Sequence, residues 1–182
     1  MTKVKKYDDY CLFCFSHLFP DNEIIRNYKT KENSVVESIK TKFPEFSWVT
    51  DKKVTDGCSN RRPDLLLDLG FQVIIIEIDE DQHNNYELIC ENKRIMEISQ
   101  DLSHRNVIFI RFNPDGYKNL DKKITSCWSY NKKGIMSIKK CKTKEWIERL
   151  EKLNSMIQYW SENNSNKMVH VEYLFYDTHC SV

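Results

Sequence analysis

Hydrophobic residues recur along this chain with two different periods, and the longer period predicts three helices. From 30 to 43 they return every three or four positions and Pro44 follows directly, so a helix is expected to end there. The same period predicts helices over 88–102 and 144–161, the latter capped by Thr143. Because the hydrophobic stripe of the last helix keeps a helical period, we interpret its tryptophans as core residues and not as a surface for stacking bases.

Runs of β-branched and aromatic residues predict the strands. The run at 71–78 is hydrophobic on both faces, which is typical of a central strand covered on both sides. A turn at 68–70 joins it to 65–67 as a hairpin. The order strand, helix, strand between 71 and 112 implies a parallel pair with a right-handed crossover. Further strands are expected at 46–49, 107–112 and 169–176, with a second hairpin formed by 125–128 and 135–138.

Together these elements predict an α/β fold with a mixed central β-sheet flanked by α-helices. Neither a repeat nor a low-complexity linker divides the chain. We therefore expect one domain over 29–182 that includes a C-terminal helical extension, preceded by an N-terminal appendage over 1–28. With 182 residues, of which 40% are hydrophobic, the chain is long enough to bury a substantial core.

Composition excludes some classes of protein and leaves others open. No hydrophobic run approaches the roughly 20 residues needed to cross a bilayer, so no membrane partner is expected. The start of the chain lacks the hydrophobic stretch of a secretion signal, and we expect an intracellular protein, cytoplasmic or nuclear. The formal net charge of +1 does not by itself indicate a nucleic-acid partner.

Seven cysteines, an odd number, argue against a disulfide framework in a chain that shows no secretion signal. Cys11 and Cys14 are separated by two residues, a spacing at which two thiolates can hold one zinc ion. Cys58 could complete such a structural zinc site, together with His17 or Cys90. Buried thiols are the simpler interpretation.

Three carboxylates occur where strands begin or end. Asp64 opens the first strand of the hairpin, and Glu77 and Asp79 follow the hydrophobic run of the second. Residues two apart on a strand share a face, so Glu77 and Asp79 are expected to project together, with Asp64 on the neighbouring strand. Crowded carboxylates are best stabilised by a hard divalent cation such as Mg²⁺ or Mn²⁺. The alternative is that they are ordinary carboxylates in solvent or in salt bridges.

The charge along the chain changes sign. The segment 77–91 contains six acidic residues and no lysine or arginine, whereas 118–144 contains nine lysines and one acidic residue. The basic segment could follow a phosphate backbone, or be an ordinary solvated surface. Arg111 could contact phosphate or form a structural ion pair with Glu91, and we favour the structural pair. The candidate nucleic-acid contacts are Arg61, Arg62, Lys132 and Lys133.

Several of these motifs occur in the order found in a known family. Arg62-Pro63-Asp64 is followed by the string Glu77–His83, then by a helix with Glu91 and Arg94, and then by the strand 107–112 that ends in arginine and phenylalanine. Over about residues 30–115 this arrangement resembles the PD-(D/E)XK nuclease superfamily, and within it the very-short-patch-repair-like endonuclease branch. The resemblance implies a restriction-endonuclease-like core and metal-dependent cleavage of phosphodiester bonds, with DNA more expected than RNA.

The resemblance also implies roles for individual residues. Asp64 and Glu77 would be ligands of Mg²⁺ or Mn²⁺, with the backbone carbonyl of Ile78 as a third. Glu32 would be the helix acid that holds a water of the metal, and Glu37 competes with it for that role.

Asp79 departs from the family pattern, which has a lysine at this position to orient the attacking water. His83 is our first candidate to take over that function, and Gln82 or Lys93 could do so instead. A structural role for Asp79 is nearly as well supported as a catalytic one. Because the lysine is missing, a non-catalytic nucleic-acid-binding module with a degenerate nuclease fold stays open, as does an RNA-cutting nuclease of the same fold.

Overall fold

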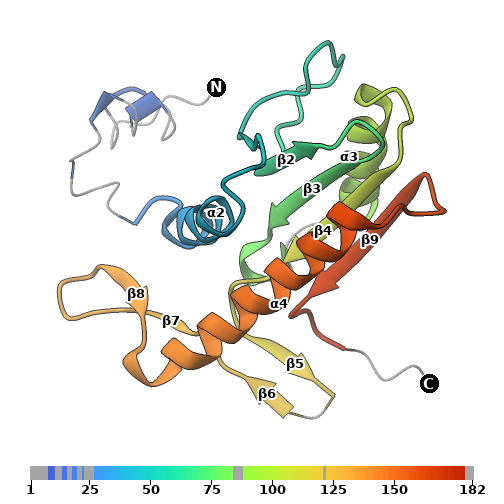
Figure 1. Cartoon of the computed structure of the whole chain (residues 1–182). Helices are drawn as coiled ribbons and strands as arrows, with labels where there is room; N and C mark the ends of the chain where they lie inside the picture. Colours follow the sequence, from blue (N-terminus) through green and yellow to red (C-terminus); the bar gives the residue numbers. More distant parts are fainter. Residues whose placement is uncertain are drawn as a thin grey trace.

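A five-stranded mixed sheet lies at the centre of the fold, with the strand order β1-β2-β3-β4-β9 (Figure 1). β1 (Val49–Thr50) and β2 (Leu65–Asp68) are antiparallel to their neighbours, whereas β3 (Val73–Ile78), β4 (Val107–Phe112) and β9 (Val169–Leu174) run parallel. The α/β class and the mixed sheet are thus confirmed. The computed structural model describes residues 8–10, 14–15, 18–19, 22, 27–83, 88–120 and 122–178.

Helices cover both faces of this sheet. α2 (Thr30–Lys42) and α4 (Thr143–Glu162) pack on one face, and their buried side chains join those of the sheet in one hydrophobic cluster. α3 (Leu88–Asp101) covers the opposite face, behind the sheet in Figure 1. The three helices lie where the hydrophobic period predicts them. No helix in the described part of the chain is both long and hydrophobic enough to span a membrane.

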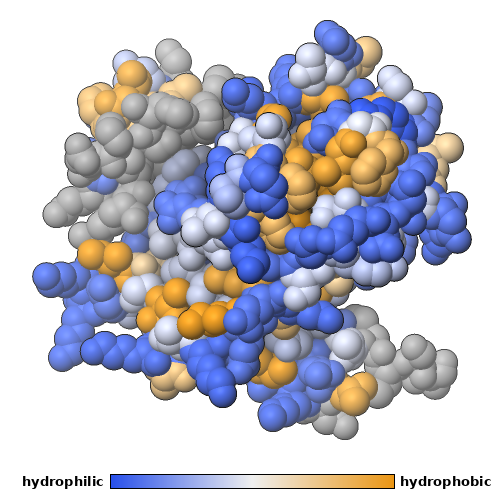
Figure 2. All heavy atoms as spheres, viewed as in Figure 1, coloured by the Kyte–Doolittle hydropathy of each residue, from blue (hydrophilic) through white to orange (hydrophobic). Residues whose placement is uncertain are grey.

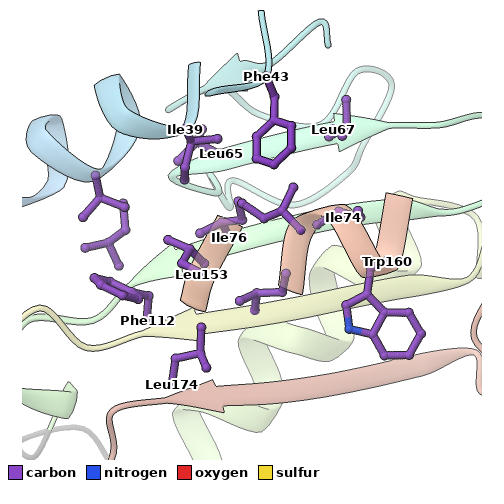
Figure 3. Close-up of a cluster of buried hydrophobic side chains, with 14 of the residues drawn as sticks. Ile39, Phe43, Leu65, Leu67, Ile74, Ile76, Phe112, Leu153, Trp160 and Leu174 are labelled. Carbon is purple, nitrogen blue, oxygen red and sulfur yellow. The ribbon is translucent and has the colours of Figure 1, made fainter. Parts of the chain in front are cut away.

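The central strand β3 is buried along its whole length, as its two hydrophobic faces predict. Ile74 and Ile76 point into the cluster with α2 and α4. Figure 3 shows Ile76 near Leu153 of α4 and Ile74 farther along β3, towards Trp160. Val73 and Ile75 point to α3. Glu77, near the end of β3, therefore projects from a strand that is packed on both faces.

Two small hairpins lie beyond the carboxyl ends of the parallel strands (Figure 1). The first pairs β5 (Tyr117–Asn119) with β6 (Lys122–Ile124), and the second pairs β7 (Trp128–Tyr130) with β8 (Met136–Ile138). The second hairpin is confirmed, although its first strand begins later than expected. The first was not predicted, because its strands are short and largely polar. Figure 2 shows hydrophilic residues at the tip of the β7–β8 hairpin, at the lower left.

The strand expected at 46–49 is largely wrong, since only Val49 belongs to β1. The aromatic residues before it pack on one another instead: the ring of Phe46 stacks on Phe43 and meets Trp48 edge-on. The indole nitrogen of Trp48 donates a hydrogen bond to the carbonyl of Phe43 at 3.3 Å. These contacts fold the segment back onto the end of α2 and prevent an extended conformation.

The predicted helix cap at Thr143 is also wrong. Thr143 is the first residue of α4, and Lys142, at the capping position, makes no side-chain cap hydrogen bond. A short 3₁₀ turn, η3 (Lys140–Lys142), leads directly into the helix, and the Thr143 hydroxyl donates to the carbonyl of Lys140 at 3.1 Å. The tryptophans of α4 are buried, which confirms that its hydrophobic stripe is core.

Candidate functional site

Asp64 and Glu77 lie opposite each other at one end of the antiparallel pair β2–β3. The register pairs Leu65 with Ile76, so Asp64, one residue before β2, faces Glu77 across the pair. A carboxylate oxygen of Asp64 accepts a hydrogen bond from the backbone N–H of Ile78 at 2.7 Å. The hairpin predicted from the sequence therefore does bring these two carboxylates together at the carboxyl end of β3.

Glu77 is 6% exposed, and its counter-charge is Arg94 of α3. The guanidinium of Arg94 reaches both carboxylate oxygens, with N–O distances of 2.8 and 2.9 Å. The same arginine donates to the carbonyl of Arg62 at 2.9 Å. Arg94 thus ties α3 to the start of the hairpin, and a cation bound at Asp64 would compete with it for Glu77.

A cavity of about 500 Å³ opens beside the two carboxylates, between the hairpin, α2 and α3. Its lining brings together residues that the sequence analysis proposed separately. These are Glu32, Arg61, Asp64, Glu77, Ile78 and Lys93. Glu37 lines a neighbouring hollow and not this one, which favours Glu32 as the helix acid.

Nearby cations compensate the carboxylates of the cavity only in part. Burial, with the negative charges of Glu77 and Glu32, raises the pKa of Asp64 from 3.8 to about 8. Burial also raises the pKa of Glu77, although Arg94 opposes this, and it raises the pKa of Glu32. Such carboxyl groups hold protons more tightly than usual or bind a cation. The cavity therefore favours a positively charged ligand beside Asp64.

Lys29, which the sequence analysis missed, is a cation that pairs with Glu32 from the neighbouring hollow. Its amine lies 2.7 Å from a carboxylate oxygen of Glu32 and 3.1 Å from one of Asp51. Burial lowers the pKa of Lys29, but the hydrogen bonds and charges of these two carboxylates outweigh that effect and raise it above the usual value. The charge of Lys29 also lowers the pKa of Asp64. Lys29 adopts a left-handed conformation, with φ 52°, just before α2, and the hydrophobic period gives no signal for that.

Asp79 does not itself line this cavity and is held in a buried ion-pair network, although its partner Arg111 and the paired Glu91 do line it. It is 1% exposed, and one of its oxygens lies 2.6 Å from Nε of Arg111 and accepts a hydrogen bond from the Tyr176 hydroxyl. Arg111 also pairs with Glu91 at 2.8 Å, which confirms the predicted structural pair. Because Asp79 is held by residues of β4 and the C-terminal segment, its contacts support the structural interpretation over the catalytic one.

Gln82, His83 and Lys93 were proposed to take over the function of the missing lysine, and their surroundings differ. The amide nitrogen of Gln82 donates to Asp177 at 2.9 Å and its amide oxygen accepts from the Asp177 backbone at 2.7 Å, so Gln82 fastens the C-terminal segment. His83 ends the turn η2 (Glu80–His83), and its side chain lies outside the described residues. The side chain of Lys93 is 67% exposed at the rim of the cavity.

The four proposed phosphate contacts are spread over the molecule. Arg61 lines the cavity and pairs with Glu97 of α3 at 2.6 Å. Arg62 is exposed on the same loop, although it does not line the cavity. Lys132 and Lys133 are exposed in the turn between β7 and β8. Only Arg61 is therefore placed directly beside the paired carboxylates.

The structure leaves the zinc prediction untested. Cys11 and His17 lie outside the described residues, whereas Cys14 is partly buried and Cys58 and Cys90 are exposed. Among the residues that are described, no three histidine, cysteine or acidic side chains are grouped closely enough to hold a metal ion.

Comparisons with known proteins do not assign the chain to a family. Searches of protein-family models, of curated proteins and of solved structures each found no match to this chain. Its function is therefore inferred from its own residues and their geometry.

Proposed function

We propose that the chain is a Mg²⁺- or Mn²⁺-dependent endonuclease that hydrolyses phosphodiester bonds, with DNA as the preferred substrate. Its core would be restriction-endonuclease-like. The order of elements supports this proposal: helix α2, the antiparallel pair β2–β3, then α3 as the crossover to the parallel strand β4. The motif resemblance described above covers the same elements.

One observation carries the proposal: the partly buried carboxylate of Asp64 and the buried carboxylate of Glu77 face each other and line a cavity. Mg²⁺ is commonly bound through one or two carboxylates and keeps several of its waters, so a group of three acidic side chains is not needed. The Ile78 carbonyl, on the same lining segment, could act as a third ligand. The oxygen-only donor set and the raised pKa of Asp64 fit a hard divalent cation.

The remaining residues of the cavity suit hydrolysis of a phosphodiester. A bound Mg²⁺ or Mn²⁺ would activate water and neutralise the charge that develops on the phosphate oxygens. Asp64 and Glu77 would hold the ion, and Glu32 would orient the attacking water and accept its proton. Arg61 at the rim would contact the phosphate of the substrate. Arg94 would keep Glu77 in place until the ion binds.

Lys29 is our candidate for the cation that replaces the lysine missing at Asp79. It is half-buried beside Glu32 and acts on Asp64, whereas Lys93 is mostly exposed. A fixed cation there would orient Glu32 and stabilise negative charge that develops beside it. This role makes Lys29 a positioning residue, because it acts through Glu32 and Asp64.

Lys29→Met is expected to lower the single-turnover cleavage rate by roughly 100-fold, the size of effect typical of a lost electrostatic contact in an active site. Lys29→Arg should retain part of the activity, and Lys93→Met should change the rate by less than about threefold. Loss of Lys29 should also move the acidic limb of the pH–rate profile upward, because Lys29 lowers the pKa of Asp64. A larger loss of rate in Lys93→Met than in Lys29→Met, or an unchanged acidic limb of the pH–rate profile in Lys29→Met, would show that Lys29 does not replace the missing lysine.

Binding of the metal should displace a proton from Asp64. Since its pKa in the metal-free protein is about 8, the carboxyl is mostly protonated at pH 7 and must lose that proton to bind an ion. The apparent affinity for Mn²⁺ should therefore fall by up to about tenfold for each unit of pH below 8. Titration calorimetry in two buffers of different ionisation enthalpy measures the released protons. We expect about one at pH 7, and a value near zero would argue against Asp64 as a ligand.

The second candidate function is a non-catalytic nucleic-acid-binding module. Two features favour it: Arg94 already forms a salt bridge with Glu77, and Asp79 stands where the family has a lysine. Digestion of DNA and RNA in parallel, with Mg²⁺, Mn²⁺ or EDTA, separates the two. Cleavage that requires the metal supports the nuclease, and the preferred polymer distinguishes a DNase from an RNase. Uncut substrate that is nevertheless shifted on a gel would support the binding module.

A further inference from the structure

A second hollow of about 550 Å³ lies apart from the carboxylate cavity, between the β5–β6 hairpin and α4. Tyr117, Lys122 and Lys123 line it from the hairpin. The N-terminal half of α4 and the segment just before it form the opposite wall. The lining there includes Lys142, Arg149 and Lys152. We call this hollow the basic groove.

Positive charge dominates the basic groove. Its lining contains five cationic and two acidic side chains. One of the acids, Glu145, is already paired with both Lys142 and Arg149. Lys122, Lys123 and Lys152 are exposed, and within the part of the chain that the structure describes they form no ion pair. The groove therefore has three cations free to meet an anionic ligand.

Aromatic rings form one side of the groove and are held in place by a buried arginine. The guanidinium carbon of Arg149 lies 5.1 Å from the ring centroids of both Tyr117 and Phe175. Arg149 is 3% exposed and donates to the carbonyl of Asp115 at 2.7 Å. Tyr117 and Phe175 remain partly exposed on the lining. Lysines on two walls beside partly exposed rings are typical of surfaces that follow a nucleic-acid backbone and stack bases.

The basic groove lies at the same end of the sheet as the paired carboxylates. Tyr117 follows β4 and Phe175 follows β9, whereas Glu77 is next to last in β3, and these three strands are parallel. We propose that the basic groove binds the phosphate backbone of a nucleic acid outside the carboxylate cavity. The choice of nucleic acid over other polyanions rests on the function proposed above.

The test uses the full chain in EDTA, so that binding is measured without cleavage. Fluorescence anisotropy with labelled 20-nucleotide single strands and 20-base-pair duplexes gives the affinity and its salt dependence. Lys122→Gln/Lys123→Gln changes the groove, and Lys42→Gln/Lys167→Gln is the matched control. The control removes the same charge from two exposed lysines, at the end of α2 and just before β9, that do not line the groove.

The groove variant should bind at least about tenfold more weakly and lose about two units of salt slope, whereas the control should change affinity less than about twofold. Lys152→Gln should weaken binding further from the other wall. Equal effects of both pairs, a larger effect in the control, or no measurable binding at 50 mM salt would overturn the proposal. Competition by poly-glutamate as strong as by unlabelled DNA would point to an acidic protein partner instead and would also overturn it.

The two proposals fail in different ways. If the chain binds DNA through Lys122 and Lys123 but does not cut it with Mg²⁺ or Mn²⁺, the basic groove is supported and the nuclease proposal is refuted. If the chain cuts DNA and the groove variant binds DNA as tightly as the unmodified chain, the nuclease is supported and the basic groove is refuted.

Discussion

Asp64→Asn is expected to abolish cleavage and at the same time to stabilise the metal-free protein. Asparagine keeps an oxygen that can accept the N–H of Ile78, so the local structure should persist. Without the carboxylate, an ion loses a ligand, and the cleavage rate should fall by roughly 1000-fold or more. The change in stability has the opposite sign because the pKa of Asp64 is raised.

The pH dependence of this stabilisation follows from the direction of the shift. The pKa of Asp64 is about 8 in the folded chain and has an ordinary value of 3.8, so ionisation of Asp64 opposes folding. That cost is absent below pH 4, grows as the pH rises to 8, and reaches at most about 6 kcal/mol. Urea unfolding in EDTA at pH 5 and pH 8 should show a larger gain for Asp64→Asn at pH 8. A loss of stability at both pH values would contradict the only partly compensated charge of Asp64.

Arg111→Met is expected to cause the largest loss of stability. Arg111 is 5% exposed and pairs with both Asp79 and Glu91, so its removal takes a buried cation away from two carboxylates. Breaking a buried ion pair costs about 3 to 5 kcal/mol. Arg105→Met is the matched control, since Arg105 pairs with Asp68 through two contacts of 2.7 Å at an exposed position. The control should cost less than about 1 kcal/mol.

Urea unfolding of both variants measures this difference. If the free energies of unfolding of Arg111→Met and Arg105→Met fall by the same small amount, the Asp79 network does not stabilise the fold. If Arg111→Met is stable but inactive, Arg111 and Asp79 belong to the active site after all.

The elements of the core were predictable because their patterns are local. β3 has two hydrophobic faces, and the periods of α2, α3 and α4 are unambiguous, so their bounds are confirmed to within a few residues. The approach of Asp64 to Glu77 follows from the same logic, because a hairpin register fixes which residues lie opposite each other. This part of the site required no long-range information.

The partners of these residues could not be read from the sequence. Arg94 reaches Glu77 across 17 positions, and Tyr176 reaches Asp79 across 97, through the docking of separate elements. In the sequence, Asp79 therefore looks like a catalytic residue of the string Glu77–His83, yet in the structure its hydrogen bonds are structural. Lys29 was not predicted because its position depends on the left-handed conformation that it adopts just before α2.

The central claim is that Asp64 and Glu77 bind the divalent ion that cleaves the substrate. Its most direct test is the single-turnover rate of DNA cleavage as Mn²⁺ is titrated, for the unmodified chain, Glu77→Gln and the control Glu151→Gln at an exposed position of α4, each with an EDTA blank. We expect saturable cleavage by the unmodified chain and by Glu151→Gln, and a rate at least roughly 100-fold lower for Glu77→Gln at every Mn²⁺ concentration. Cleavage that persists in EDTA, or is equal in all three proteins, would contradict the claim.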